Sequence, residues 1–240
     1  MPPPVITLLT DFGDASAYVA MLKGGLLRRF PDVQLVDLGH HFRARPILEA
    51  AFHLLRVYTY YPAGTIHLVG IDEGSARGLR AAAAGQIFLA ADNGVLGPVL
   101  EREAARVWAL APDNPTTFLA RDVLVPAAGG ALAPGAEVTD WRRLPLPRPE
   151  RTAAGSLGQV LHVDRFGNLL TNFTVADLPR PQATAEIGAQ RVEGWREDYG
   201  AAEGELFLLV GAEGWIEVSA ARASAAERLG AAAGTPVLLR

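Results

Sequence analysis

The chain has 240 residues, half of them apolar and a fifth charged, and this balance excludes a wholly disordered protein. It contains no cysteine and a single lysine, Lys23, which excludes disulfides, thiolate metal sites and a cysteine nucleophile and leaves little material for Schiff-base chemistry. The net charge is -4 without any run of Lys or Arg, so the composition favours a small ligand over a nucleic acid or a membrane surface.

The first 143 residues alternate between strand and helix patterns. Residues 5–10 carry apolar or β-branched side chains on both faces, as in a strand buried on both sides, and a helical period then runs to Phe30, where Pro31 ends it. The pattern continues with a strand at residues 34–38, a helix at 47–60, strands at 65–71 and 86–90, a short helix after Asn93 and a strand at 107–110. This alternation predicts an N-terminal three-layer α/β domain with a mainly parallel sheet.

A proline at every other position of residues 144–149 separates this part from the rest. We therefore expect an N-terminal domain over residues 1–143, a Pro-rich linker over 144–155 and a C-terminal domain over 156–240. Beyond the linker, short apolar runs alternate with Gly, Asn or Asp, at residues 159–163, 169–173, 183–187, 206–210, 215–219 and 236–239. This spacing predicts a smaller antiparallel β domain with one helix near residues 221–229.

Polar side chains follow the predicted strands of the N-terminal domain, at the sheet edge where ligands of α/β proteins gather. They are Thr10 and Asp11, Asp37 and His40, Asp72 and Glu73, and Asp92 and Asn93. Carboxylates without a Cys/His cluster can bind a divalent cation or accept two hydrogen bonds from a ribose diol, and spacing does not choose between these. Each can also be a turn former or a helix cap, which is the role we favour for Asp92 and Asn93.

Six short segments then carry a family resemblance by their order along the chain. They are TDFG at residues 10–13, VDLGH at 36–40, EAAF at 49–52, PAGTIH at 62–67, DNGVLGPVL at 92–100 and HVDRFGN at 162–168, with a seventh, SAAERL, at 224–229. In these segments the chain resembles the S-adenosylmethionine (SAM) hydroxide adenosyltransferases, a family that also contains fluorinating and chlorinating enzymes. The resemblance covers nearly the whole chain.

The resemblance implies hydrolysis of SAM at C5′ to adenosine and methionine, with no cofactor and no metal. It also implies a homotrimer whose active sites lie between the N-terminal domain of one subunit and the C-terminal domain of the next. The expected partner is a small adenosyl ligand, with no nucleic acid and no membrane. Because no stretch reaches ~18 apolar residues and no basic, apolar leader precedes the first strand, we expect a cytoplasmic protein.

Carried over position by position, the resemblance places substrate contacts at Asp11, Phe12, Leu119, Ala120, Asp164, Phe166 and Asn168. Asp11 is expected to accept hydrogen bonds from the ribose hydroxyls, and the residues from 164 to 168 to contact the adenine and the methionine part. The alternative roles are a helix cap for Asp11 and a plain β-turn for residues 164–168. Trp195 or Tyr199 could cover a pocket from the C-terminal domain.

The residues that prepare the attacking water are only partly retained. The family's hydrolase branch has Asp and Arg in a D-P-G-V-G-x-x-R-like loop and His in a T-F-H-G-R-D-like segment. Here the loop is two residues shorter and reads DEGSAR at residues 72–77, so Asp72 is kept and Arg77 is the expected counterpart, with Arg80 as second choice. The other segment reads TFLARD at residues 117–122, and Leu119 cannot transfer a proton.

Two explanations of Leu119 are open. Either Asp72 with Arg77, or the nonstandard Glu73, positions the water, or the protein binds an adenosyl ligand with little or no turnover. His41 is an outside candidate for the missing proton acceptor. Ala120 stands where the fluorinating branch has serine and the chlorinating branch has glycine, so fluoride is the least expected nucleophile and a chloride-using homologue is the weakest alternative.

Overall fold

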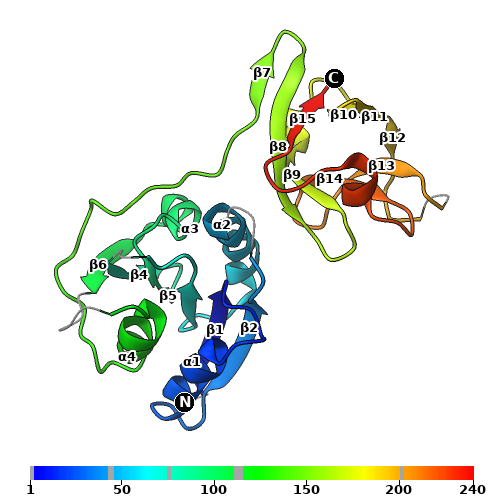
Figure 1. Ribbon diagram of the computed structural model, residues 1–240. Coiled ribbons are helices and arrows are strands. Elements are labelled where there is room, and N and C mark those ends of the chain that lie inside the picture. The colour runs from blue at the N-terminus through cyan, green and yellow to red at the C-terminus, as the bar shows by residue number, and fades with distance from the viewer. Residues whose placement is uncertain (1–2, 43–45, 75–76, 111–115, 201–202) are drawn as a thin grey trace. The chain divides into compact units, whose positions relative to one another are not determined.

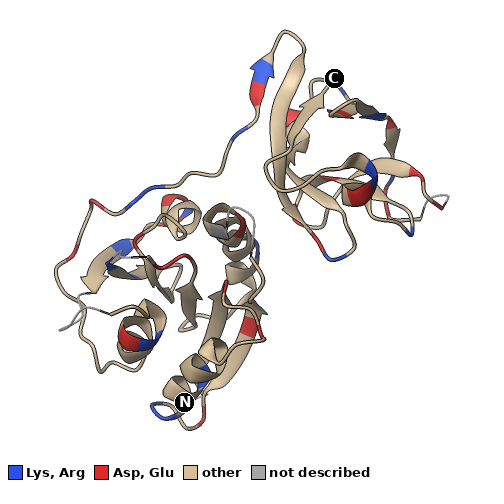
Figure 2. Ribbon diagram, in the orientation of Figure 1, with Lys and Arg blue, Asp and Glu red and all other residues tan. Residues whose placement is uncertain are grey.

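The computed structural model describes residues 3–42, 46–74, 77–110, 116–200 and 203–240 (Figure 1). The chain forms two compact units, Met1–Pro145 and Leu146–Arg240, which are described separately. In the described part of the chain, no helix is long and apolar enough to cross a membrane. Charged side chains of both signs are interspersed over both units (Figure 2).

The N-terminal unit is built on a six-stranded sheet with the order β2-β1-β3-β5-β4-β6. The strands are β1 (Val5–Thr10), β2 (Gln34–Gly39), β3 (Ile66–Gly70), β4 (Gly78–Ala83), β5 (Gln86–Ala91) and β6 (Arg106–Leu110). The helices are α1 (Tyr18–Leu27), α2 (Pro46–Val57), the 3-10 turn η1 (Tyr58–Tyr60), α3 (Gly97–Arg102), the π-helical turn η2 (Ala120–Leu124) and α4 (Val125–Ala128). Strands β2, β1, β3 and β5 are parallel, whereas β4 is antiparallel to β5 and β6. The predicted α/β domain with a mainly parallel sheet is therefore confirmed.

Helices cover both faces of this sheet (Figure 1). Leu9 belongs to the apolar cluster on the side of α2 and α3, whereas its neighbour Leu8 belongs to the cluster on the side of α1 and α4. Both leucines are fully buried, because successive side chains of a strand point to opposite faces and each face is covered by helices. This explains why residues 5–10 show no alternation of apolar and charged side chains.

Strand β4 is not among the elements expected from the sequence. Its second half is a run of alanines, which have a low preference for strands and no visible alternation. The structure pairs β4 with β5 through the two residues Ala84 and Gly85, which both have positive φ, as a type I′ hairpin turn requires. The preference of the alanines is thus overridden by pairing on both sides.

The C-terminal unit is a largely antiparallel, barrel-like β domain, as predicted. Its strands are β7 (Glu150–Thr152), β8 (Gly155–Val163), β9 (Leu169–Thr174), β10 (Ala185–Ile187), β11 (Gln190–Val192), β12 (Gly194–Trp195), β13 (Leu206–Val210), β14 (Trp215–Ala220) and β15 (Pro236–Leu239). The sheet order is β11-β10-β15-β8-β9-β14-β13-β12, with β7 paired to β8. The stretch expected as a linker over residues 144–155 is therefore partly structured, because β7 and the start of β8 form a hairpin within it.

One α-helix, α5 (Ala225–Leu229), follows β14, and the 3-10 turn η3 (Val175–Asp177) follows β9. Ser224 caps α5 by accepting a hydrogen bond from the Glu227 amide, and Gly230 ends the helix in the left-handed conformation. The helix expected over residues 221–229 is therefore shorter at its start, where Ser224 fixes the first turn.

Candidate functional site

The carboxyl ends of β1 and β3 bring two predicted site residues together. Asp11 follows β1 and Asp72 lies two residues beyond β3, and the two strands are parallel neighbours. The amide of Asp72 donates a hydrogen bond of 2.9 Å to Oδ2 of Asp11. Burial raises the pKa of the Asp11 carboxyl, and the Asp72 amide partly opposes the rise. Helix α1 begins only at Tyr18 and has no side-chain cap, so the helix-cap role is not the one that Asp11 has here.

Glu73 lies beside this pair and reaches the segment that contains Leu119. Its Oε1 accepts a hydrogen bond of 2.9 Å from the amide of Ala120. The carboxylate lies over Gly70, where a Cβ atom would come within 3.2 Å of Oε1, 3.1 Å of the Phe12 ring and 3.3 Å of the Ala120 methyl. Burial raises the pKa of Glu73 to about 7, and the negative charge of Asp11 adds to the rise.

Three aromatic rings form an apolar wall next to these carboxylates. Phe12, Tyr18 and Phe118 contact one another edge to face, with centroid distances of 5.7 Å (Phe12 to Tyr18), 5.4 Å (Phe12 to Phe118) and 5.2 Å (Tyr18 to Phe118). Phe118 is buried, whereas Tyr18 is half exposed. Of these rings, Phe12 lies with the Glu73 carboxylate over Gly70, and burial is the largest cause of the raised pKa of Glu73.

Leu119 and Ala120 lie at the start of η2 and are both buried. The Leu119 side chain packs in the apolar cluster on the side of α1 and α4, together with residues such as Leu22 and Leu68. Turns of the π type are rare in proteins, and those that occur often lie at functional sites. Here the turn places the main chain of residue 120, and not a side chain at 119, against the carboxylate of Glu73.

Asn93 holds the loop that carries Asp72. Its Nδ2 donates to the carbonyl oxygens of Ile71 at 2.7 Å and Asp72 at 3.0 Å, and its Oδ1 accepts from the Val95 amide at 3.1 Å. Asp72 has a φ of 39°, a conformation that non-glycine residues adopt at a cost of about 1–3 kcal/mol. Asn93 does not cap α3, which begins only at Gly97, but stabilises the strained conformation of Asp72.

Replacing Asn93 by Ala is expected to free the Ile71 and Asp72 carbonyls and to lower the free energy of unfolding by about 1–3 kcal/mol. Hydrogen exchange of the Asp72 amide, measured by NMR, should accelerate because its loop loosens. The control is Thr65→Val, which removes one side-chain bond to a carbonyl before the start of β3. Equal exchange of the Asp72 amide in Asn93→Ala and wild type would contradict this role.

The two candidate arginines, Arg77 and Arg80, contact residues other than Asp72 and Glu73. Nε of Arg77 pairs with Asp92 at 2.8 Å and an outer nitrogen pairs with Asp140 at 2.9 Å. Asp92 also accepts from the amide of Arg142 at 2.7 Å, so Arg77 ties the start of β4 to the segment that ends the N-terminal unit. The Arg80 guanidinium lies over the Trp108 ring at 5.2 Å.

Neither arginine forms an ion pair with Asp72 or Glu73 in the described part of the chain. Residues 75 and 76 of the same loop lie outside the described residues. His41 pairs at 3.4 Å with Asp14, an exposed carboxylate of the loop after β1. No group of three His, Asp or Glu side chains arranged as metal ligands occurs among the residues that the structure describes.

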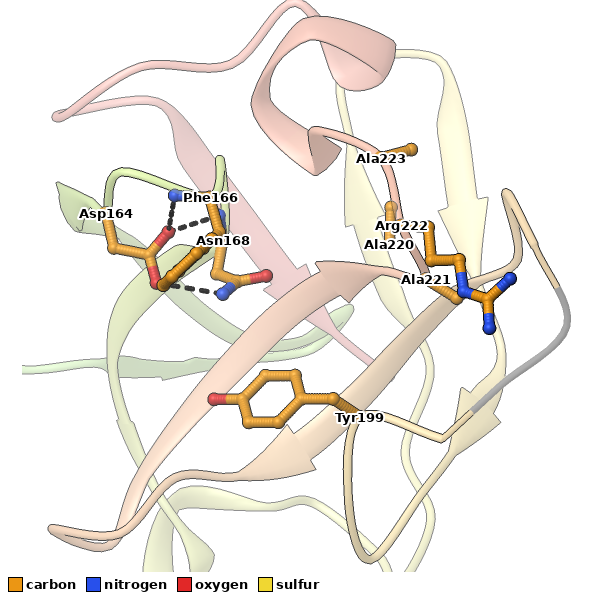
Figure 3. A pocket seen from close by; sticks show the side chains of 8 residues that line it. All are labelled: Asp164, Phe166, Asn168, Tyr199, Ala220, Ala221, Arg222 and Ala223. Atoms are coloured by element: carbon orange, nitrogen blue, oxygen red, sulfur yellow. Dashed lines mark hydrogen bonds between the residues drawn. The ribbon is translucent and has the colours of Figure 1, made fainter.

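The C-terminal unit contains a pocket of about 610 Å³ that includes three predicted residues. Its walls are Asp164, Phe166, Asn168, Tyr199, Ala220, Ala221, Arg222 and Ala223 (Figure 3). Oδ1 of Asp164 accepts from the amides of Phe166 and Asn168, each at 2.9 Å, and Oδ2 accepts from Nδ2 of Asn168 at 2.8 Å. The turn of residues 164–168 therefore exists, and it is also what shapes one wall of the pocket.

This turn leaves two groups available to a ligand. The Phe166 ring is 76% exposed, and the carboxamide oxygen of Asn168 points away from Asp164 (Figure 3). Tyr199 lies on the other side of the pocket and donates to Oε2 of Glu217 at 2.9 Å, and burial raises its pKa to about 12. Trp195 lines a different cavity, of about 660 Å³, so only Tyr199 lies in this pocket.

Arg222 was not predicted as a site residue from the sequence. It lies just after β14, has a φ of 53° and lines the pocket without an ion pair to any described residue. The sequence pattern gave no sign of this role, because Arg222 falls within the helix expected over residues 221–229, whereas the structure begins α5 only at Ala225. A pocket with an aromatic ring, an amide and a guanidinium can bind a flat heterocycle together with an anionic group.

Comparison with known proteins covers both units. The family model for the SAM hydroxide adenosyltransferase N-terminal domain matches residues 6–141, and that for the C-terminal domain matches residues 158–238. A protein of Thermus thermophilus named (R)-S-adenosyl-L-methionine hydrolase is 33% identical over 98% of this chain and 98% of its own length. A fluorinase of an Actinoplanes species is 27% identical over 78% of this chain and 76% of its own. The crystal structure of an uncharacterized conserved protein of Thermotoga maritima has a TM-score of 0.87 at 25% identity, covering 98% of this chain and 99% of that one.

Proposed function

Since the chain belongs to the SAM hydroxide adenosyltransferase family, we propose that it cleaves SAM at C5′ with water and releases adenosine and methionine. The observation that carries the proposal is the position of Asp11. Its carboxylate is held by the Asp72 amide at the edge of a parallel sheet, beside the half-buried Glu73 and an aromatic wall.

In this proposal Asp11 binds the ribose. A carboxylate has about four acceptor positions, so Asp11 can accept from the Asp72 amide and still accept two hydrogen bonds from a vicinal diol. Partial burial makes such charge-assisted hydrogen bonds stronger than they are in water. The neighbouring Phe12 offers an apolar surface to the sugar carbons.

The pocket of the C-terminal unit binds the rest of the substrate. The exposed Phe166 ring stacks on the adenine, and the carboxamide oxygen of Asn168 accepts from a nitrogen of the base or of the methionine part. The guanidinium of Arg222, which forms no ion pair with a described residue, attracts the carboxylate of the methionine part. Together these contacts hold both ends of SAM and leave C5′ between them.

The reaction needs little from the protein beyond positioning. The sulfonium is already a good leaving group, so the oxygen of water forms a bond to C5′ while the C5′–S bond breaks and methionine leaves as a neutral thioether. Asp72 and Glu73 position the attacking water. Arg77 stabilises their loop through its ion pairs with Asp92 and Asp140. Neither a cofactor nor a metal ion is part of this proposal.

The family resemblance also implies a homotrimer in which two different subunits supply the contacts to one substrate molecule. Sedimentation velocity should then show one species of three 25.5 kDa chains. A stable monomer would remove this part of the proposal.

The experiment that tests the activity is incubation of the purified protein with (R)-SAM and (S)-SAM separately, with and without chloride, followed by chromatography. We expect adenosine and methionine in equal amounts from one of the two forms. The (R) form is the expected substrate, because the relatives' names specify it. Chloride should yield no 5′-chloro product, because the sequence offers a halide only the small Ala120.

A second candidate is an adenosyl-binding protein without turnover, and the buried, apolar Leu119 favours it. Calorimetric binding of S-adenosylhomocysteine together with no adenosine above the spontaneous background of SAM would support this second function. The chloride-using homologue is a weaker alternative, and the chloride arm of the same experiment decides it.

A further inference from the structure

We propose that Glu73 takes the proton from the attacking water and so replaces, from a different loop, the histidine that this chain lacks at residue 119. The inference rests on the proposed hydrolysis of SAM. It assigns one proton-accepting group among the candidates that the sequence left open.

The side chain of Glu73 is placed for this role by three contacts. Its Oε1 is held at 2.9 Å by the amide of Ala120, the residue directly after Leu119. The carboxylate lies over Gly70, next to the Phe12 ring, where a Cβ atom at residue 70 would come within 3.2 Å of Oε1. A carboxylate that accepts from main-chain amides on one side keeps acceptor positions for a water molecule on another.

The charges around Glu73 favour a group that can hold a proton. The titratable groups that face it are Asp11 from the end of β1 and Asp122 from η2, both of them carboxyls. Asp122 is itself paired with Arg121, and among the described residues no Lys, Arg or His forms an ion pair with Glu73. Burial is the largest cause of its raised pKa, and Asp11 and Asp122 raise it further, so the carboxyl titrates near neutral pH.

Asp72 is less suited to take the proton. The side chain of Asp72 is exposed. Its contacts are made by its main chain, whose amide donates to Asp11 and whose carbonyl oxygen accepts from Asn93. Glu73 is half-buried beside the same Asp11 and has the apolar wall at its side. Of the two carboxylates, Glu73 is therefore the better-desolvated one.

The step balances without a further reactant. The C5′–O bond forms from water, the C5′–S electron pair goes to sulfur, and the positive charge of the sulfonium is lost as methionine leaves. The proton of the water passes to the Glu73 carboxylate and then to solvent.

The test compares wild type with Glu73→Gln and Glu73→Asp in adenosine formation from pH 5 to 9. For wild type we expect kcat to rise with a single ionisation near pH 7, since only the ionised carboxylate accepts a proton. Glu73→Gln should lower kcat by about 10²–10⁴-fold and remove the pH dependence, and Glu73→Asp should restore part of it. Binding of S-adenosylhomocysteine should change less than threefold in Glu73→Gln.

The control is Asp122→Asn, which removes the second carboxyl that faces Glu73. It should keep kcat and move the midpoint of the pH profile to lower pH, because one source of the raised pKa is gone. The shift should be small, because the charge of Asp122 is the smallest of the causes that raise this pKa, and a midpoint that moves to higher pH would contradict a Glu73 titration.

A stability measurement separates catalysis from a structural role. The pKa of Glu73 in the folded protein, about 7, lies above its ordinary 4.5, so ionisation costs stability as the pH rises between these values. The Tm of Glu73→Gln relative to wild type should therefore rise from pH 5 to pH 7 and stay higher above it. A lower Tm of Glu73→Gln at pH 8 would indicate a structural carboxylate and overturn the inference.

The possible failures are distinguishable. Wild-type protein that forms no adenosine at any pH overturns both the proposed function and this inference. Wild-type protein that cleaves SAM while Glu73→Gln keeps the same kcat and pH profile overturns the inference alone.

Discussion

Asp11→Ala is expected to lower kcat/KM for SAM by about 10²–10⁴-fold, because two charge-assisted hydrogen bonds to the ribose, each of about 1.5–3 kcal/mol, are lost together. The binding of S-adenosylhomocysteine should weaken in parallel, since the ribose is the same in both molecules. Calorimetry and initial rates measure the two quantities.

Asp11→Asn separates ribose binding from loop support. Its carbonyl oxygen can still accept from the Asp72 amide, so the loop keeps its contact while the charge is removed. The matched control is Asp14→Ala, which removes an exposed carboxylate from the same loop and should change binding little. If Asp11→Ala binds S-adenosylhomocysteine with unaltered affinity, Asp11 does not bind the ribose.

Gly167→Ala is expected to destabilise the C-terminal unit by about 2–4 kcal/mol and to weaken ligand binding. Gly167 has a φ of 83°, and a Cβ there would come within 2.7 Å of the Cα atom of Ser224. The main chain must therefore move, and it cannot do so freely because the Ala226 amide donates to the Gly167 carbonyl at 2.9 Å. The displaced turn carries Phe166 and Asn168 out of the pocket wall.

Gly188→Ala is the control for Gly167→Ala, because Gly188 has a φ of 59° and open space around it. It should cost only the conformational strain of about 1–2 kcal/mol and leave ligand binding unchanged. Thermal unfolding and calorimetry of both variants isolate the effect of the close contact. Equal losses of Tm would mean that the packing of the turn on α5 does not matter.

The segment of residues 72–77 is one of two places where the sequence differs from the family pattern that it resembles. It is two residues shorter than the family pattern, and the acid at residue 73 is nonstandard. The departure coincides with a leucine at residue 119, and the structure joins the two positions through the hydrogen bond from Ala120 to Glu73. The proposed transfer of the proton-accepting role explains both changes by one physical cause.

The sequence by itself determined the layered α/β unit and the meeting of Asp11 with Asp72. The apolar or β-branched side chains on both faces of residues 5–10 are typical of a strand covered on both sides, and residues that follow parallel strands meet at one edge of the sheet. The turn of residues 164–168 is local, with hydrogen bonds between residues at most four apart, so its existence could also be predicted from the sequence, and the substrate contacts of these residues stay a prediction.

Only the tertiary structure decided which partner each long side chain takes. Arg77 lies in the loop with Asp72, yet its guanidinium pairs with Asp140, 63 residues further along. Glu73 reaches an amide 47 residues away, and the alanines of β4 form a strand because strands on both sides pair with them. Periodicity records which face of an element is buried, whereas the choice among distant partners depends on packing that no local pattern encodes.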